Sequence, residues 1–202
     1  MCGRYELNET PARLGSRYRV EPGDLDFVPN ADVRPTTVNP VLLVRDEVRH
    51  IELRRWGFVP SWLEDPKAVS SPFNAVSETA PDKPFFRTAF RKRRCIVPAN
   101  AFLEWQVVPG EKRKARIRIA GADGALLSLG GLYEYWRRGE EAVASYTILT
   151  TEPNALMAPI HTRMPVVIGD ADLDDWLAPE TGLESVKAMC MPCPSEWLVV
   201  AA

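Results

Sequence analysis

The chain has 202 residues and a mass of 22.6 kDa, which is the size of one domain or of two very small ones. Its 25 basic and 27 acidic residues give a net charge of −2, so any nucleic-acid site must be a local patch. No run of about 18 apolar residues occurs, which argues against a membrane span. With four cysteines and no secretion signal, we expect reduced thiols and a cytoplasmic protein.

The predicted elements are a mixture of strands and helices without a regular βαβ rhythm. β-prone or alternating segments predict strands at Val41–Val44, Val48–Phe58, Arg94–Trp105, Ala115–Ala120, Ala125–Trp136 and Ala142–Thr150. Helices are predicted at Pro84–Lys92, Glu152–Pro159, Asp170–Leu177 and Thr181–Met189. We therefore expect one α+β domain over residues 1–202, built around a mostly antiparallel β-sheet or open barrel with flanking short helices. The tail from about residue 180 is left unassigned.

Charge is distributed unevenly along the chain. Between Lys83 and Arg118 there are eleven Lys or Arg residues against two acids, whereas Glu140 to Ala202 holds two basic residues against ten acids. A charge run is often only a solvated face. The same run could instead place several cations along one nucleic-acid strand, and the sequence leaves both interpretations open.

Cys2 is the first candidate for chemistry. Removal of Met1 would leave an amine and a thiol on the same residue. The amine can condense with an aldehyde to an imine, and the thiol can then close a five-membered thiazolidine ring. Gly3 leaves the backbone beside Cys2 uncrowded. The alternative is a terminal residue without a role.

Three further residues could assist such chemistry. Glu104 lies in an apolar segment, where a carboxylate is costly unless it is paired or functional, and where its pKa would rise. His161 lies in a predicted loop and could move protons near neutral pH. Asn74 lies in a loop-like segment and could orient a hydroxyl. Each also has a structural alternative, as an arginine partner, a packing residue and a turn residue respectively.

Five blocks of the chain, in order, resemble the SOS response-associated peptidase (SRAP) family, the abasic-site-processing proteins. The resemblance covers roughly residues 1–178. Its blocks are Met1-Cys2-Gly3-Arg4-Tyr5, Arg55-Trp56-Gly57-Phe58-Val59-Pro60-Ser61-Trp62, Asn74-Ala75-Val76-Ser77-Glu78-Thr79, Arg94 to Trp105, and Thr147 to Pro165 with His161.

This resemblance implies a DNA-damage enzyme that crosslinks itself to abasic sites in single-stranded DNA. It implies Cys2 as the nucleophile, freed by autoproteolysis and linked through a thiazolidine. By the same resemblance, Asn74 orients the sugar-derived oxygen, Glu104 is the general acid/base, and His161 assists proton transfer and crosslink reversal. We also expect an abasic-site lyase activity, a monomer, and no cofactor, metal or membrane partner.

Departures from the family pattern concern DNA contacts and the tail. Val76 replaces a common Arg, and Leu103 and Asn100 replace a frequent Tyr and Asp. The Cys190 and Cys193 pair alone provides too few ligands for a zinc site. Cationic and planar side chains suit phosphates and unstacked bases. The predicted DNA contacts are Arg4, Trp62, Arg87, Arg91, Arg93 and Arg163.

Two other functions fit parts of the same pattern. Cys2, His161 and Asn74 could form a thiol protease acting on other proteins. This is disfavoured because any leader other than Met would displace a nucleophile at position 2. The basic middle could alternatively belong to a non-catalytic single-strand-binding module.

Overall fold

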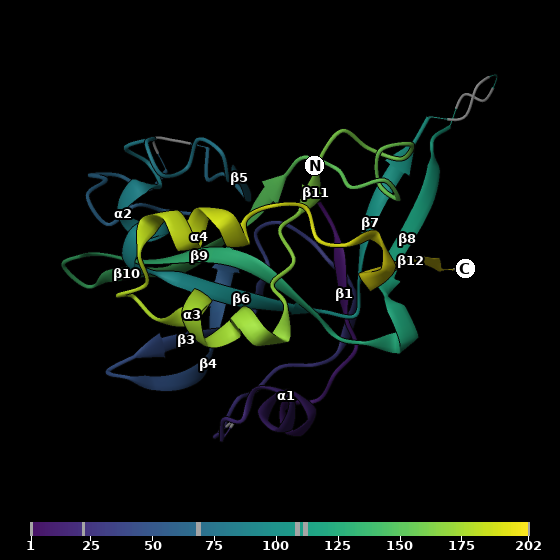
Figure 1. Cartoon of the computed structure of the whole chain (residues 1–202). Coiled ribbons are helices and arrows are strands. Elements are labelled where there is room, and N and C mark those ends of the chain that lie inside the picture. The colour runs from purple at the N-terminus through teal and green to yellow at the C-terminus, as the bar shows by residue number, and fades with distance from the viewer. Residues whose placement is uncertain (1, 22, 68–69, 108–109, 111–112, 202) are drawn as a thin grey trace.

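Two β-sheets, joined through a shared core, organise the chain (Figure 1). The computed structural model describes residues 2–21, 23–67, 70–107, 110 and 113–201. The strands are β1 (Tyr5–Leu7), β2 (Asn30–Val33), β3 (Val38–Arg45), β4 (Val48–Trp56), β5 (Asn74–Val76), β6 (Arg94–Ala99), β7 (Ala101–Gln106), β8 (Ala115–Gly121), β9 (Leu127–Arg138), β10 (Glu141–Thr151), β11 (Met164–Pro165) and β12 (Leu198–Ala201). The helices are α1 (Pro11–Tyr18), α2 (Arg87–Lys92), α3 (Leu173–Leu177) and α4 (Leu183–Met189), with 3₁₀ turns η1 (Ala122–Gly124), η2 (Asp170–Asp172) and η3 (Ser195–Trp197).

The larger sheet closes into a barrel. Its strands follow the order β10-β4-β3-β6-β9, and β9 pairs again with β10. Among the strands of the described residues, the pairings of β10 with β4 and with β5 are the parallel ones. The smaller sheet has the antiparallel order β12-β8-β7-β1-β2. The prediction of an α+β fold around mostly antiparallel strands is therefore confirmed, and the barrel is closed.

Aromatic packing joins the two sheets. Trp56 of β4 is fully buried, stacks on Tyr146 of β10 at 6.2 Å between ring centroids, and meets Tyr5 of β1 edge-on at 5.2 Å. The hydroxyls of Tyr5 and Tyr146 form a hydrogen bond of 2.8 Å. Because Tyr5 is only three residues after Cys2 in the sequence, this packing fixes the N-terminal segment against the barrel.

The chain crosses from the barrel to the smaller sheet at Asn100. The sequence predicts one strand from Arg94 to Trp105, but β6 ends at Ala99 and β7 begins at Ala101. The Asn100 side chain accepts a hydrogen bond from the Asn8 backbone at 2.6 Å and donates to Glu9 at 2.9 Å. These bonds satisfy the polar groups at the corner and set the direction of β7.

The predicted helix Glu152–Pro159 is wrong. Residues 155–160 instead form successive turns. Pro153 disfavours the helical conformation of the residue before it, and Pro159 lacks the N–H that a helix would need. The Asn154 side chain accepts from the Met157 N–H at 3.0 Å and closes the first turn.

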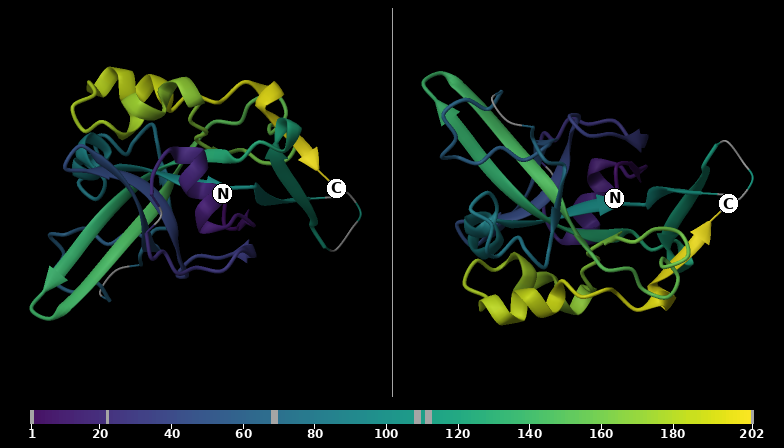
Figure 2. Two further views of the ribbon diagram at one scale, coloured as in Figure 1. Left: turned by 90° about the horizontal axis from the view of Figure 1, so that it is seen from below. Right: turned by 90° about the horizontal axis from the view of Figure 1, so that it is seen from above.

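Short helices cover one side of the barrel, and the β9–β10 hairpin extends away from it (Figure 2). The predicted helices near 84–92, 170–177 and 181–189 are present in shortened form as α2, α3 and α4. Helix α1 was not predicted, although Thr10 followed by Pro11 is a common helix start and the Thr10 side chain accepts from the Arg13 N–H at 3.3 Å. No helix in the described residues is long and apolar enough to span a membrane.

Candidate active site

The four residues predicted to carry chemistry lie around the N-terminal end of β1. Cys2 precedes β1, Asn74 is the first residue of β5, Glu104 is in β7, and His161 lies three residues before β11. Figure 1 shows the N-terminus beside β7 and β11. Segments far apart in the sequence therefore supply one small polar cluster.

Cys2 is fully buried at the edge of this cluster. Its Sγ lies 3.6 Å from the Arg4 carbonyl oxygen, and its own carbonyl accepts a 2.8 Å hydrogen bond from Asn74 Nδ2. Burial, followed by the nearby charge of Glu104, raises the pKa of the Cys2 thiol. The thiol is consequently held in its protonated form, and a neighbouring base would be needed to activate it.

Glu104 is a buried carboxyl beside that thiol, with 3% of the residue exposed. Its strand alternation turns it toward the protein interior opposite Ile117 of β8, whereas Trp105 faces the other way. Burial raises the pKa of Glu104, and the neighbouring His161 partly opposes that rise. A carboxyl with a raised pKa can donate a proton and then accept one, as a general acid/base must.

His161 faces Glu104 across a short gap. Its Nε2 lies 3.9 Å from Glu104 Oε2. Its Nδ1 accepts a hydrogen bond of 3.0 Å from the Arg163 N–H and lies 3.1 Å from the Arg163 carbonyl oxygen. In the neutral ring this pattern places the proton on Nε2, toward Glu104. When the ring is protonated, Nδ1 can donate to the same carbonyl, but the Arg163 N–H then loses its acceptor on the ring.

An ion pair that the sequence analysis missed fixes the loop carrying His161. Arg163 forms two hydrogen bonds to Glu78, at 2.8 and 2.7 Å, and a third of 2.5 Å to the Thr150 carbonyl. The hydrogen bond from Arg163 lowers the pKa of Glu78. Glu78 belongs to the segment that starts at Asn74, so this pair ties two sides of the cluster together. Glu78 and Arg163 are 85 positions apart in the chain, so no local spacing in the sequence indicates their pairing.

Arg163, Arg93 and Arg4, three of the predicted DNA contacts, already have carboxylate partners. Arg93 pairs with Glu134 at 2.5 Å. Arg4 pairs with Asp32 at 3.2 Å and lies over the Trp105 ring at 5.4 Å. Their contacts to phosphate stay a prediction.

The other three predicted DNA contacts are open to solvent. Arg87 and Arg91 are exposed on α2, and Trp62 is 57% exposed. The basic stretch as a whole does not form one face, because the buried Arg94 points inward and donates to backbone carbonyls of Trp176, Phe90 and Arg91. The exposed candidates are therefore Arg87 and Arg91 on α2 and Trp62, whose ring contacts Phe85 just before that helix.

The tail cysteines pack behind the His161 loop. Cys190 and Cys193 are free and buried, and burial raises their pKa values to about 12 and about 11. Asn154 Nδ2 donates to the Cys193 carbonyl at 3.0 Å. Among the residues described, no group of three His, Cys, Asp or Glu side chains is placed to hold a metal.

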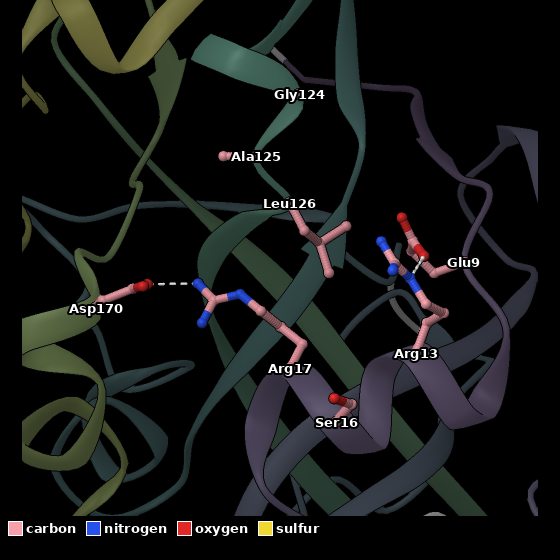
Figure 3. Close-up of a pocket in the computed structure, with 8 residues that line it drawn as sticks. All are labelled: Glu9, Arg13, Ser16, Arg17, Gly124, Ala125, Leu126 and Asp170. Carbon is pink, nitrogen blue, oxygen red and sulfur yellow. Dashed lines mark hydrogen bonds and ion pairs between the residues drawn. The ribbon is translucent and has the colours of Figure 1, made fainter.

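A separate groove of about 450 Å³ lies between α1, η1 and η2 (Figure 3). Arg13 and Arg17 of α1 line it, paired with Glu9 and Asp170 respectively. It contains none of the four predicted catalytic residues.

Known proteins resemble this chain over most of its length. An abasic site processing protein of Bacillus subtilis, YoqW, is 33% identical over 200 residues, covering 95% of this chain and 87% of its own. The abasic site processing protein HMCES of Xenopus tropicalis is 29% identical, covering 88% of this chain and 66% of its own.

Solved structures agree with the fold. A protein from Bordetella bronchiseptica superposes with a TM-score of 0.84 at 29% identity, covering 99% of this chain and 98% of its own. One from Bacteroides thetaiotaomicron has the same TM-score at 23% identity, covering 98% and 90%. The family model described as SOS response associated peptidase matches residues 1–202. The chain therefore belongs to the SOS response associated peptidase (SRAP) family.

Proposed function

We propose that this chain processes abasic sites in DNA, by linking Cys2 covalently to the ring-opened sugar in a single strand. The names of its relatives support abasic-site processing. The observation that carries the covalent mechanism is the placement of Cys2. Asn74 holds its carbonyl at 2.8 Å, and the buried Glu104 lies beside its thiol.

The first step is removal of Met1. Hydrolysis of the bond between Met1 and Cys2 consumes one water and releases free Met and the Cys2 amine. In this proposal the Cys2 thiol is the nucleophile and Glu104 the acid/base of the cleavage, which is the autopeptidase activity. The hydrogen bond from Asn74 then keeps Cys2 in place after its upstream neighbour has left.

The second step is imine formation. The Cys2 amine adds to the aldehyde carbon of the open sugar and gives a carbinolamine. Glu104 donates its proton to the departing hydroxyl, water leaves, and a C=N bond remains. A raised pKa suits Glu104 to this step because it increases the fraction of the carboxyl that carries a proton to donate.

The third step closes the ring. Glu104, now a carboxylate, takes the proton of the Cys2 thiol, and the sulfur adds to the imine carbon. The nitrogen keeps the proton it already carries and takes up the electron pair of the C=N bond, and a thiazolidine forms without any change in oxidation state. His161 relays protons between Glu104 and the reacting atoms. In reversal it protonates the departing group.

Lyase activity competes at the imine. Loss of a proton from the sugar carbon next to C=N expels the 3′ phosphate and breaks the strand. Ring closure by the Cys2 thiol removes the C=N bond and stops that elimination. The protein therefore protects the strand as long as the thiazolidine persists.

The test uses single-stranded oligonucleotides with and without one abasic site. We expect purified protein to form a denaturation-resistant adduct with the abasic strand alone, heavier than the protein by the mass of the strand less one water. Non-covalent binding of both strands without an adduct would instead indicate a binding module. Cleavage of peptide substrates without an adduct would indicate the thiol protease.

A further inference from the structure

Trp62 is a large apolar side chain that the fold leaves open to solvent. It is 57% exposed, yet its ring meets Phe85 edge-on at 6.1 Å between centroids. Phe85 in turn lies 6.0 Å from the buried Phe58. A tryptophan supported from below and bare above has the form of a stacking surface rather than of a core residue.

The loop that presents Trp62, residues 57–63, is fixed at both ends. Gly57 leaves β4 with φ +140°, a conformation that other residues rarely adopt. The Val59 N–H donates to Ser145 Oγ at 3.0 Å, and Trp136 Nε1 donates to the Leu63 carbonyl at 2.7 Å. Val59 and Leu63 also pack with Trp136 in a small apolar cluster separate from the main core.

Between those ends, the loop is held by one buried carboxylate, Glu134 of β9. Its Oε2 accepts from Ser61 Oγ at 3.3 Å and from Arg93 Nη2 at 2.5 Å, and its Oε1 accepts from the Tyr135 N–H at 3.0 Å. Only 5% of Glu134 is exposed. Burying a carboxylate costs free energy unless hydrogen bonds or an opposite charge compensate it. At Glu134, three donors provide this compensation.

The same carboxylate also fixes α2. Arg93 directly follows α2, and that helix carries the exposed cations Arg87 and Arg91. Glu134 thus sets the position of Trp62 relative to the cations that could neutralise neighbouring phosphates.

We propose that Glu134 is a positioning residue, which holds the 57–63 loop and α2 together so that Trp62 is preformed to stack on a base of the bound strand. The proposal rests on the proposed function in taking a single DNA strand as the ligand. Fixing Trp62 before binding lowers the ordering cost that a mobile loop would incur. Simple electrostatics predicts the opposite effect, because removing an acid should tighten binding to an anionic strand.

A second buried ion pair provides the matched control. Glu6 of β1 is 6% exposed and pairs with Arg118 at 2.8 Å. Replacing Glu6 or Glu134 by Ala removes one buried charge and frees one arginine. Only Glu134 contacts the loop that carries Trp62.

The experiment measures affinity for an undamaged, mixed-sequence single-stranded oligonucleotide, with thermal melting to verify folding. Trp62→Ala should weaken binding by about 5- to 150-fold, the range for loss of one base–aromatic stack. Glu134→Ala should weaken it by roughly fivefold or more, and the double variant should bind no more weakly than Trp62→Ala. Glu134→Gln keeps one side-chain oxygen that can accept from the Tyr135 N–H, and its amide N–H can donate to Ser61 Oγ, so it should regain part of the affinity. Glu6→Ala should not weaken binding.

Unchanged or tighter binding by Glu134→Ala would overturn the proposal, as would effects of Glu134→Ala and Trp62→Ala that simply multiply. If Glu134→Ala does not fold, Ser61→Ala replaces it, with a smaller loss and the same lack of additivity with Trp62→Ala. Because undamaged DNA has no abasic aldehyde, its binding tests the role of Glu134 without depending on the covalent reaction of Cys2. Absence of any adduct on abasic DNA would reject the covalent function and leave this binding cycle interpretable.

Discussion

The active-site cluster and the α1 groove both place acids near bases, but they differ in burial. In the cluster, the buried Glu104 lies 3.9 Å from His161, and burial raises its pKa. In the groove, Arg17 pairs directly with Asp170, whose side chain is 74% exposed (Figure 3). Each charge in the groove pair is stabilised by water and by its partner, whereas Glu104 is destabilised in its charged form. A buried ionisable group with a shifted pKa is typical of functional sites. A surface groove without such a group does not by itself indicate function.

The largest effect on adduct formation is expected when the amine or the thiol of Cys2 is removed. A variant with an extra blocked residue before Cys2 should form no adduct, since the imine needs a primary amine. Cys2→Ala keeps the amine, so it should form only a reversible imine and give more strand cleavage than the wild type. The measurement is a denaturing gel of abasic single strands. Stable adduct at wild-type yield from either variant would contradict the thiazolidine.

The second largest effect is expected at Glu104. Glu104→Gln removes the acid/base and should slow adduct formation by about 10²-fold or more. Because the protonated carboxyl is the acid, the wild-type rate should fall as the pH rises through the raised pKa of Glu104, and the variant should lose that dependence. A time course of adduct formation across pH measures both. An unchanged rate in Glu104→Gln would show that another group carries the proton.

The stability of the same variant checks the pKa independently. The folded-state pKa of Glu104 lies above its unfolded value of about 4.3, so folding takes up a proton between the two. Wild-type stability should therefore fall as the pH rises through that window. Glu104→Gln escapes this loss and should unfold at higher denaturant at neutral pH, with the difference vanishing below about pH 4.

Changing His161 should separate reversal from formation. His161→Ala leaves Glu104 in place, so adduct formation should slow less than in Glu104→Gln. Reversal should slow at least as much as formation, because reopening the ring requires protonation of the departing group. Release of a preformed adduct into excess unlabelled abasic strand measures reversal. Equal rates for wild type and variant in both directions would remove His161 from the mechanism.

The sequence singled out four residues that lie together in the fold, but it did not predict the contacts that hold them there. Five ordered blocks pointed to Cys2, Asn74, Glu104 and His161, and the structure brings these residues into one cluster. The barrel strands were found because their alternating or β-prone segments are long, whereas short strands such as β1 and β5 have too few residues to show a pattern.

Long-range pairing explains most of what was missed. The Glu78–Arg163 and Glu134–Arg93 pairs join residues that are 85 and 41 positions apart. No local pattern in the sequence can therefore indicate these contacts. The basic stretch was one run in sequence, but its neighbours Arg93 and Arg94 have separate roles. Arg93 meets a carboxylate, and Arg94 caps buried carbonyls.

A smaller effect is expected for the exposed cations of α2. Binding of undamaged single strands should weaken with salt, by roughly 0.7 log units per log salt for each neutralised phosphate. Arg87→Ala or Arg91→Ala should make that slope shallower by about one phosphate. Lys187→Ala, on α4 and paired with Glu184, is the control. Identical slopes in all variants would mean that α2 is only a solvated face.

The smallest effect should come from the groove. Asp170→Asn removes the partner of Arg17 at a site where water already screens the charges, so the free energy of unfolding should change by about 1 kcal/mol or less. Adduct formation should stay at the wild-type rate, because the groove shares no residue with the Cys2 cluster. Denaturant unfolding and the abasic-strand time course measure the two quantities on one sample. A slow adduct with normal stability would show that the groove takes part in DNA processing. In that case, the burial of a charged group such as Glu104 would not distinguish the functional site from an exposed ion pair such as Arg17–Asp170.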